Sequence, residues 1–158
     1  MKKRGFTLAE ILVSLGIIGV VSALALPTFM SKTQTRTHEA TLNTSVTAIE
    51  NAIGIYMANE SANSLDETSI INENNETSAL IENLRNYLKF TETNYLEDND
   101  SQSILLKNGS VATLKITNIN NDRVGWAKID TNGEAAPNRR NVDIFDYDIM
   151  SNGELIRQ

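Results

Sequence analysis

The sequence begins MKKRGFTLAEILVSLGIIGVVSALALP (residues 1–27), a basic start followed by a long apolar run. Residues 11–26 contain no charged side chain. A basic start before an apolar stretch is typical of an export or membrane-anchoring signal. With a helical rise of about 1.5 Å per residue, Phe6 to Phe29 would span about 36 Å, which is enough to cross a hydrocarbon layer of about 30 Å.

Glu10 does not fit a plain membrane anchor, because it is the one acidic residue at the start of this apolar run. A carboxylate at the bilayer centre costs about 2.5–3.5 kcal/mol, and less near the interface. Glu10 is therefore either a tolerated charge at the helix start or a carboxylate that awaits a cation from a neighbouring chain. The residues alone leave both interpretations open.

Residues 2–21, KKRGFTLAEILVSLGIIGVV, resemble the prepilin-type cleavage and methylation signature of type IV pilins and type II secretion pseudopilins. The resemblance implies that prepilin peptidase cleaves between Gly5 and Phe6 and that Phe6 is then methylated on its nitrogen. It also implies that Glu10 takes part in filament assembly, and Pro27 matches a proline often found along the pilin helix. The resemblance covers roughly a fifth of the chain.

Physical chemistry supports these implied roles. Cleavage would expose a cationic amine at Phe6, and a carboxylate such as Glu10 of the adjacent subunit needs a cation as its partner in lipid. Pro27 lacks an amide donor, so we expect a kink or a melted helical turn nearby. Pairing of the Phe6 amine with Glu10 would fix the axial register of neighbouring helices. The bend near Pro27 would set the angle of the head.

The resemblance implies three parts: a leader (1–5), a membrane-spanning and filament-core helix (6–30), and a head (31–158). The positive-inside rule places the basic leader in the cytoplasm. We therefore expect a single-pass inner-membrane protein whose head lies in the periplasm or, in a filament, outside the cell. The expected partners are prepilin peptidase and other pilin or pseudopilin subunits, in a pilus or a pseudopilus.

A competing interpretation uses the same apolar run. Ala23 and Ala25 form an Ala-x-Ala pattern, so an ordinary signal peptidase could cut after Ala25 and release a soluble domain. The product would be a secreted binding protein, or a membrane-tethered one if the run is retained as an anchor. Glu10 is uncharacteristic of an ordinary signal core, which favours the pilin-like interpretation.

Charge and composition exclude several classes of function. The 158 residues carry a formal charge of −6, and the chain without its three-cation leader has 11 basic against 20 acidic residues, or −9. An acidic head is poorly suited to phosphate contacts, so no nucleic acid is expected, and the pair Arg139-Arg140 is expected in a solvated turn. The absence of cysteine excludes disulfides, thiolate metal sites and cysteine catalysis.

The head reads as α+β, with a long helix packed on a small antiparallel sheet. An apolar stripe at spacings of three and four continues the first helix, which we expect from Phe6 to Ala58. Residues 59–76 read as a long exposed loop, and a short amphipathic helix follows over residues 80–88. The stripe of the long helix consists of Ala40, Leu42, Val46, Ile49, Ile53, Tyr56 and Met57. The candidate N-cap of the short helix is Thr77 or Ser78.

Alternating patterns predict the strands of this sheet. Residues 103–107 and 110–117 are expected to form a hairpin through a two-residue type I′ turn at Asn108-Gly109. Further strands are expected over 124–129 and 142–150, and a last short strand after Asn152-Gly153.

The head contains no recognisable catalytic constellation, so no enzyme activity is expected. Its acidic residues gather at 97–100, at 130–134 and at Asp143, Asp146 and Asp148. Asp130, Asn132 and Glu134 place oxygen ligands at alternate positions near a glycine, as a calcium loop begins, but the full EF-hand pattern is absent. A solvated acidic turn is the expectation there, calcium is the alternative, and no other cofactor is expected. His38, the single histidine, is expected on an exposed helix surface.

Overall fold

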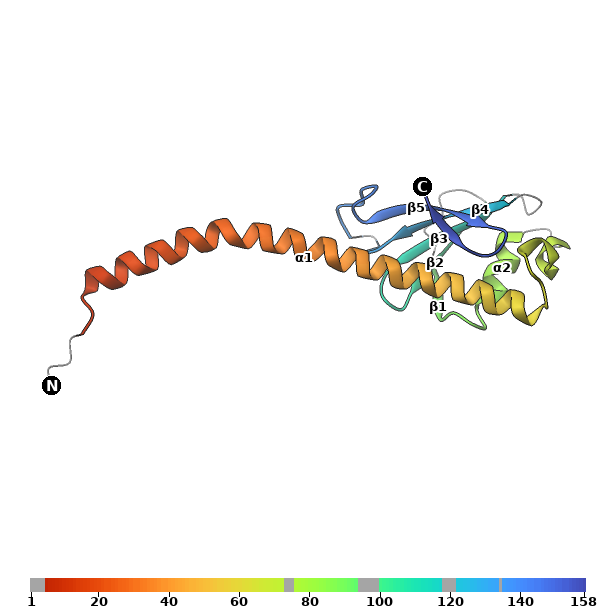
Figure 1. Ribbon diagram of the computed structural model, residues 1–158, viewed down its shortest axis with the longest axis horizontal. Helices are drawn as coiled ribbons and strands as arrows, with labels where there is room; N and C mark the ends of the chain where they lie inside the picture. The colour runs from red at the N-terminus through yellow and green to blue at the C-terminus, as the bar shows by residue number, and fades with distance from the viewer. Residues whose placement is uncertain (1–4, 73–75, 94–99, 118–121, 134) are drawn as a thin grey trace. The chain divides into compact units, whose positions relative to one another are not determined.

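The computed structural model describes residues 5–72, 76–93, 100–117, 122–133 and 135–158, and it divides into two compact units. The first unit covers residues 1–37 and the second covers residues 38–158. Helix α1 (Leu8–Asn59) begins in the first unit and ends in the second, as the ribbon in Figure 1 shows. The expected long helix is thus confirmed, with its bounds within two residues of those predicted.

The first unit contains α1 up to Thr37, and its apolar side chains face outward. Phe6 is 85% exposed, and the large apolar side chains that follow it are also exposed. The helix continues through Pro27, so the expected melted turn is not observed. Proline removes only its own hydrogen bond, and the bonds on either side keep the helix continuous.

In its described residues, the second unit is built from the end of α1 and nine further elements. They are η1 (Leu65–Glu67), η2 (Ser69–Asn72), α2 (Glu76–Leu84), β1 (Phe90–Thr93), β2 (Gln102–Leu106), β3 (Val111–Ile116), β4 (Arg123–Asp130), β5 (Ile144–Met150) and β6 (Leu155–Arg157). The strands form one sheet in the order β1-β2-β3-β4-β5-β6, and each pairs antiparallel with the next. The predicted α+β class is confirmed.

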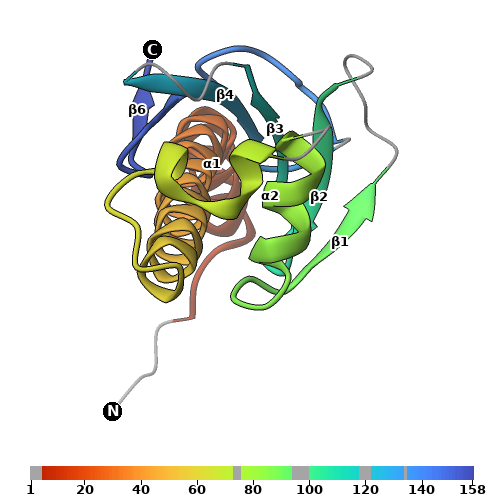
Figure 2. The ribbon, with the colours of Figure 1, turned by 90° about the vertical axis from the view of Figure 1, so that its right-hand side faces the viewer.

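One face of the sheet packs against the helices and forms the core. Figure 2 shows the second unit end-on, with the strands curving around α1 and with α2 on the same side of the sheet. From Leu42 onward the predicted stripe on α1 is buried except at Val46, which is half-buried, and Ile49 and Ile53 are both 0% exposed. Phe145, Tyr147 and Ile149 meet this stripe from alternate positions of β5, as a period of two requires.

The two Asn-Gly turns have the same geometry, which differs from the predicted two-residue turn. Gly109 N donates to Leu106 O at 3.0 Å, and Leu106 N donates to Ser110 O at 2.9 Å. Gly153 N likewise donates to Met150 O, and only the glycine of each pair has a positive φ, +86° in both. A type I′ turn needs positive φ at both central residues, so each connection is a three-residue loop that ends in a left-handed glycine.

The segment at residues 59–76 was predicted as an exposed loop, and this prediction is wrong in part. It contains the short helices η1 and η2, and Leu65 and Ile70 are both 0% exposed. Leu65 N also donates to Ser151 O at 2.8 Å, which fixes this segment to the turn after β5. Residues 73–75 lie outside the described part of the chain.

Several boundaries differ from those expected. Helix α2 begins at Glu76, so the predicted N-cap Thr77 lies inside the helix. Thr77 is buried, and its Oγ1 accepts a hydrogen bond from Ile116 N. The helix ends at Leu84, four residues early, and is followed by strand β1, which was not predicted. Strand β5 begins at Ile144 rather than at residue 142. Both helix corrections arise because contacts with the sheet decide which residues remain helical.

Candidate functional site

The amino-terminal end of α1 is capped by Thr7 and Glu10. Glu10 N donates to Thr7 Oγ1 at 3.3 Å, and Glu10 Oε2 accepts from Thr7 N at 2.8 Å. The Thr7 hydroxyl also donates to Glu10 Oε2 at 2.9 Å. This reciprocal pattern is a capping box, and it explains why the helix begins at Leu8, directly after Thr7.

The capping box holds the Glu10 carboxylate beside the residue that cleavage would make the first of the chain. Phe6, Ala9, Val13 and Ser14 line a shallow hollow next to Glu10. One carboxylate oxygen accepts both Thr7 bonds, so the group keeps acceptor capacity for a further donor. Chemically, this end of the helix can receive a cation within an otherwise apolar surface.

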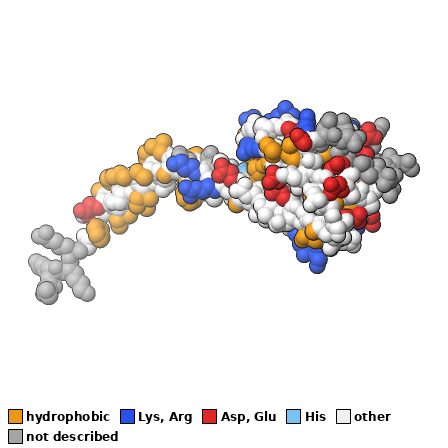
Figure 3. Space-filling view, turned by 45° about the vertical axis from the view of Figure 1, so that its right-hand side comes forward, with side chains coloured by type: hydrophobic (Ala, Val, Ile, Leu, Met, Phe, Trp, Pro, Cys, Tyr) orange, Lys and Arg blue, Asp and Glu red, His pale blue; other side chains and the backbone are white. Residues whose placement is uncertain are grey.

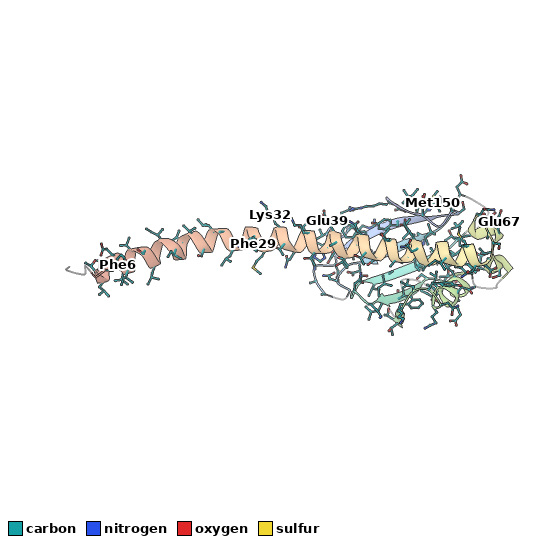
Figure 4. All side chains as sticks on the ribbon, turned by 60° about the horizontal axis from the view of Figure 1, so that its bottom comes forward. Phe6, Phe29, Lys32, Glu39, Glu67 and Met150 are labelled. Atoms are coloured by element: carbon teal, nitrogen blue, oxygen red, sulfur yellow. The ribbon has the colours of Figure 1, made fainter. Side chains whose placement is uncertain are left out.

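The helix beyond Glu10 has the length and composition of a membrane span. A window within α1 is apolar enough to cross a membrane, and none of that window is buried. Figure 3 shows apolar side chains around this part of the helix, followed by basic side chains, and Figure 4 labels Phe6, Phe29 and Lys32 along it. Lys32 and Arg36 are the first basic residues after the leader.

Residues 1–26 match the family model described as the prokaryotic N-terminal methylation motif. The chain carries the prepilin-type signature of type IV pilins and pseudopilins. The matched stretch contains Gly5, Phe6 and Glu10, whereas Pro27 lies one residue beyond it. Comparison with curated proteins and with solved structures finds no match. Lys2, Lys3 and Arg4, the basic residues of the predicted leader, lie outside the residues that the structure describes.

The head of this prepilin-like chain buries the carboxylate that was expected in a solvated turn. Asp130 ends β4 and is only 4% exposed, so the expectation of a solvated position is wrong for this residue. Its Oδ1 accepts a bond from Asn132 N at 3.1 Å. Burial raises the pKa of the Asp130 carboxyl, and the nearby Asp143 carboxylate adds to the rise against the lowering effect of backbone hydrogen bonds and His38.

Asp130 and Asn132 come together, but the proposed calcium ligand set is incomplete in the described residues. Asp130 Oδ2 and Asn132 Oδ1 are both buried, and neither has a hydrogen-bond partner among the residues that the structure describes. The third candidate, Glu134, lies outside the described residues. Within the described ranges, no group of three or more His, Cys, Asp or Glu side chains could hold a metal ion. Calcium binding thus stays a prediction.

The other acidic positions have separate roles. Asp143 is 0% exposed, and its carboxylate accepts the backbone N–H groups of Asn138 and Arg139 at 2.8 and 2.6 Å. It therefore organises the loop before β5. Asp146 and Asp148 form ion pairs on the sheet, and residues 97–99 of the first acidic cluster lie outside the described residues.

His38 was expected on an exposed surface, and the structure places it in a contact instead. Its Nδ1 lies 2.7 Å from Thr131 Oγ1, and the Thr131 hydroxyl donates to Asp143 O at 3.1 Å. With the Thr131 hydroxyl donating to Asp143 O, the tautomer of His38 that fits this contact is the one with a proton on Nδ1. Its position four residues before Leu42 is a sequence signal that places His38 on the same face of α1 as the apolar stripe, but it does not identify Thr131 as the partner.

Proposed function

We propose that the chain is a structural subunit of a type IV pilus or a type II secretion pseudopilus. In this proposal, prepilin peptidase cleaves after Gly5, Phe6 is methylated, and subunits assemble through the amino-terminal helix. The observation that carries the proposal is the methylation motif over residues 1–26, with Glu10 at the head of an exposed apolar helix. A structural role, rather than an enzymatic one, follows from the same signature.

The capping box suggests how Glu10 would select the register between subunits. In the single chain, Thr7 donates two hydrogen bonds to one oxygen of the Glu10 carboxylate, but it supplies no positive charge. The new amine at Phe6 of a neighbouring chain would supply that charge, and pairing would remove two isolated charges from the apolar layer. A register that leaves Glu10 without an amine would leave a carboxylate in the filament core.

The location of each part follows from this assembly. The basic leader would lie on the cytoplasmic face, the apolar helix in the inner membrane, and the head in the periplasm or on the filament surface. Assembly would exchange lipid contacts of the helix for contacts with other helices. The exposed side chains from Ile11 to Met30 provide the surface for that exchange.

Substitution of Glu10 tests this proposal. Glu10→Ala should reduce assembled filaments at least tenfold, because it removes the charge that pairs with the amine, while membrane insertion is unchanged or improved. Glu39→Ala is the matched control, since Glu39 is an exposed carboxylate on the same helix beyond the apolar stretch. Filaments are measured by electron microscopy and by the amount of the protein that shearing releases. Insertion is measured by the amount of the protein in the membrane fraction.

The competing class is a secreted or membrane-tethered binding protein whose apolar run is only a signal or anchor. That class requires no contact between amino-terminal helices. Filament formation by Glu10→Ala at the level of the unaltered chain would count against the register mechanism. Absence of filaments from the unaltered chain together with release of a soluble head would support the competing class.

Calcium in the loop after β4 is a second proposal, and the two unpaired buried oxygens favour it. Asp130 Oδ2 and Asn132 Oδ1 lack donors within the described structure, and oxygen atoms of this kind are the ligands that calcium takes. The ion would neutralise the Asp130 carboxylate and stabilise the head. Thermal unfolding of the head with and without calcium, described in the Discussion, tests this proposal.

A further inference from the structure

The face of the sheet that is turned away from α1 carries an aromatic and charged cluster. In the register of β4 and β5, Trp126 lies opposite Asp148 and Lys128 lies opposite Asp146. Opposed residues share a face of a sheet, and the intervening Ala127 is buried in the core. The four side chains are therefore held together on the outer face by two rigid paired strands.

Trp126, Lys128 and Asp146 of this cluster line a hollow of about 290 Å³ that lies wholly within the second unit, and Asp148 lies beside it, opposite Trp126. Arg123, Arg140 and Gln158 complete its charged and polar lining. The lining has three cations and one carboxylate side chain, so it is locally positive by two charges although the chain has a formal charge of −6. Local charge of the opposite sign to the whole chain attracts anions to this place.

Ion pairs hold the side chains of Arg123, Arg140, Asp146 and Asp148 in place, and each of these side chains keeps some hydrogen-bonding atoms for a ligand. Arg123 Nε lies 2.7 Å from Asp148 Oδ1, and Gln158 Nε2 donates to the same oxygen at 2.7 Å. Arg140 Nε lies 2.8 Å from Asp146 Oδ2. Within the described residues, these contacts engage one oxygen of each aspartate and the Nε of each arginine. The other carboxylate oxygens and the outer guanidinium N–H groups remain open to a ligand.

Donors and acceptors thus alternate beside a half-buried indole. The hydroxyl groups of a sugar both donate and accept, so they match open carboxylate oxygens and guanidinium groups together. The apolar face of a sugar ring can lie on the indole, and a guanidinium pairs well with a single carboxylate. A phosphate polymer fits less well, because its repeated charges would meet the Asp146 carboxylate in the lining.

We propose that this hollow binds an acidic saccharide, a sugar unit with one carboxylate such as a uronic acid within a polysaccharide. Trp126 supplies the surface for the ring, Arg140 binds the carboxylate, and Asp146 accepts a hydroxyl. The proposal goes beyond the filament function and does not depend on assembly, because every residue involved belongs to the second unit.

The test uses the full chain in detergent micelles, with a trigalacturonate as the probe. Trp126 is the one tryptophan of the chain, so its fluorescence reports directly on the hollow. We expect a saturable fluorescence change, and Arg140→Gln should weaken binding about tenfold, as loss of one charge-assisted hydrogen bond does. Arg139→Gln is the matched control, since the neighbouring arginine does not line the hollow.

Two further measurements complete the test. Trp126→Ala should weaken binding in calorimetry about tenfold or more while the circular dichroism of the head is unchanged, and a neutral trigalactose should bind more weakly than trigalacturonate. Absence of saturable binding would overturn the proposal. So would equal loss in Arg139→Gln and Arg140→Gln, equal binding of the neutral sugar, or tighter binding of single-stranded oligothymidylate.

Discussion

At the scale of the single residue, burial of the Asp130 carboxyl makes its contribution to folding stability depend on pH, and this dependence can be measured. Burial raises the pKa of its carboxyl above the ordinary value near 4, so the folded head holds the proton more tightly than the unfolded chain. The resulting stability is complete below the unfolded pKa and is lost as pH rises through the folded pKa. At neutral pH, the Asp130 carboxyl therefore contributes less to the stability of the head than it does at acid pH.

Asp130→Asn should raise the melting temperature of the head at pH 7 in the presence of EGTA. The amide keeps an oxygen that can accept from Asn132 N, and it removes the charge that burial disfavours. The gain should shrink as the pH falls towards 4, where the unaltered carboxyl becomes protonated. A variant that is less stable at pH 7, or a gain that is independent of pH, would contradict this account.

Calcium provides a separate result in the same experiment. If Asp130 and Asn132 bind the ion, calcium should raise the melting temperature of the unaltered chain and leave that of Asp130→Asn unchanged. Equal melting temperatures of the unaltered chain with calcium and with EGTA would remove the calcium proposal. The pH dependence would still stand, because it requires no metal.

Gly125 lies where β3 and β4 approach closely, and alanine should not be tolerated there. A Cβ at this position would collide with the backbone carbonyl of Lys115, which cannot move without separating the strands. We expect Gly125→Ala to destabilise the head by about 1–3 kcal/mol, the usual cost of overpacking. Chemical denaturation measures this value, and an unchanged midpoint would contradict the strand contact.

Gly54→Ala is the control with the opposite sign. Gly54 is exposed on α1, and a Cβ there meets no atom within 4 Å. Alanine in an exposed helix interior is favoured over glycine by about 0.5–1 kcal/mol. This variant should therefore be more stable than the unaltered chain by about that amount.

The positions of individual side chains show where sequence reasoning fails. Asp130 and His38 were both expected in solvent, because acidic residues near a glycine and a lone histidine are usually exposed. Their burial and contact depend on residues distant in the sequence, such as Thr131 against His38. Local pattern contains no information about such a partner, although the spacing of His38 from Leu42 places it on the packed stripe.

At the scale of the element, the two Asn-Gly turns form a natural comparison. In each, the asparagine Oδ1 accepts the N–H two residues later, from Ser110 in one and Glu154 in the other. Only Asn108 also reaches α1, where its Nδ2 donates to Ser45 Oγ at 2.9 Å. Ser45 in turn lies 2.7 Å from Ser110 in a buried contact. The first turn is therefore joined to the helix, and the second lacks this contact.

Asn108→Ala should destabilise the head by about 1–2 kcal/mol more than Asn152→Ala. Both substitutions remove the bond within the turn, but only the first removes the bond to Ser45 and leaves buried serine hydroxyls with fewer partners. Urea denaturation of both variants measures the difference. Equal destabilisation would show that the contact between the hairpin and α1 contributes no stability.

The same turns show how far element prediction reaches. The Asn-Gly pairs predict where both hairpins turn, because glycine supplies the positive φ that each turn needs. They do not predict the loop length, because the first residue of each loop, Lys107 or Ser151, has no marked preference. Strand β1 is missed for a similar reason, since four residues at a sheet edge give little alternation.

At the scale of the whole molecule, the chain separates into a part that sequence explains and a part that it does not. Motif and apolar length together predict the amino-terminal helix, because those features need no distant partner. The core of the head is also predictable, since the stripe from Leu42 and the alternation in β5 both mark buried faces. The cluster around Trp126 is not, because strand register and ion pairs create it.

The most direct test of the central claim is the intact mass and amino-terminal sequence of the protein recovered from membranes of its native host. The pilin-like account predicts a chain that begins at Phe6 and carries one additional methyl group on its amino terminus. Such a chain would establish prepilin processing. A chain that begins at Leu26, without the added methyl group, would mean ordinary signal cleavage after Ala25 and would contradict the account.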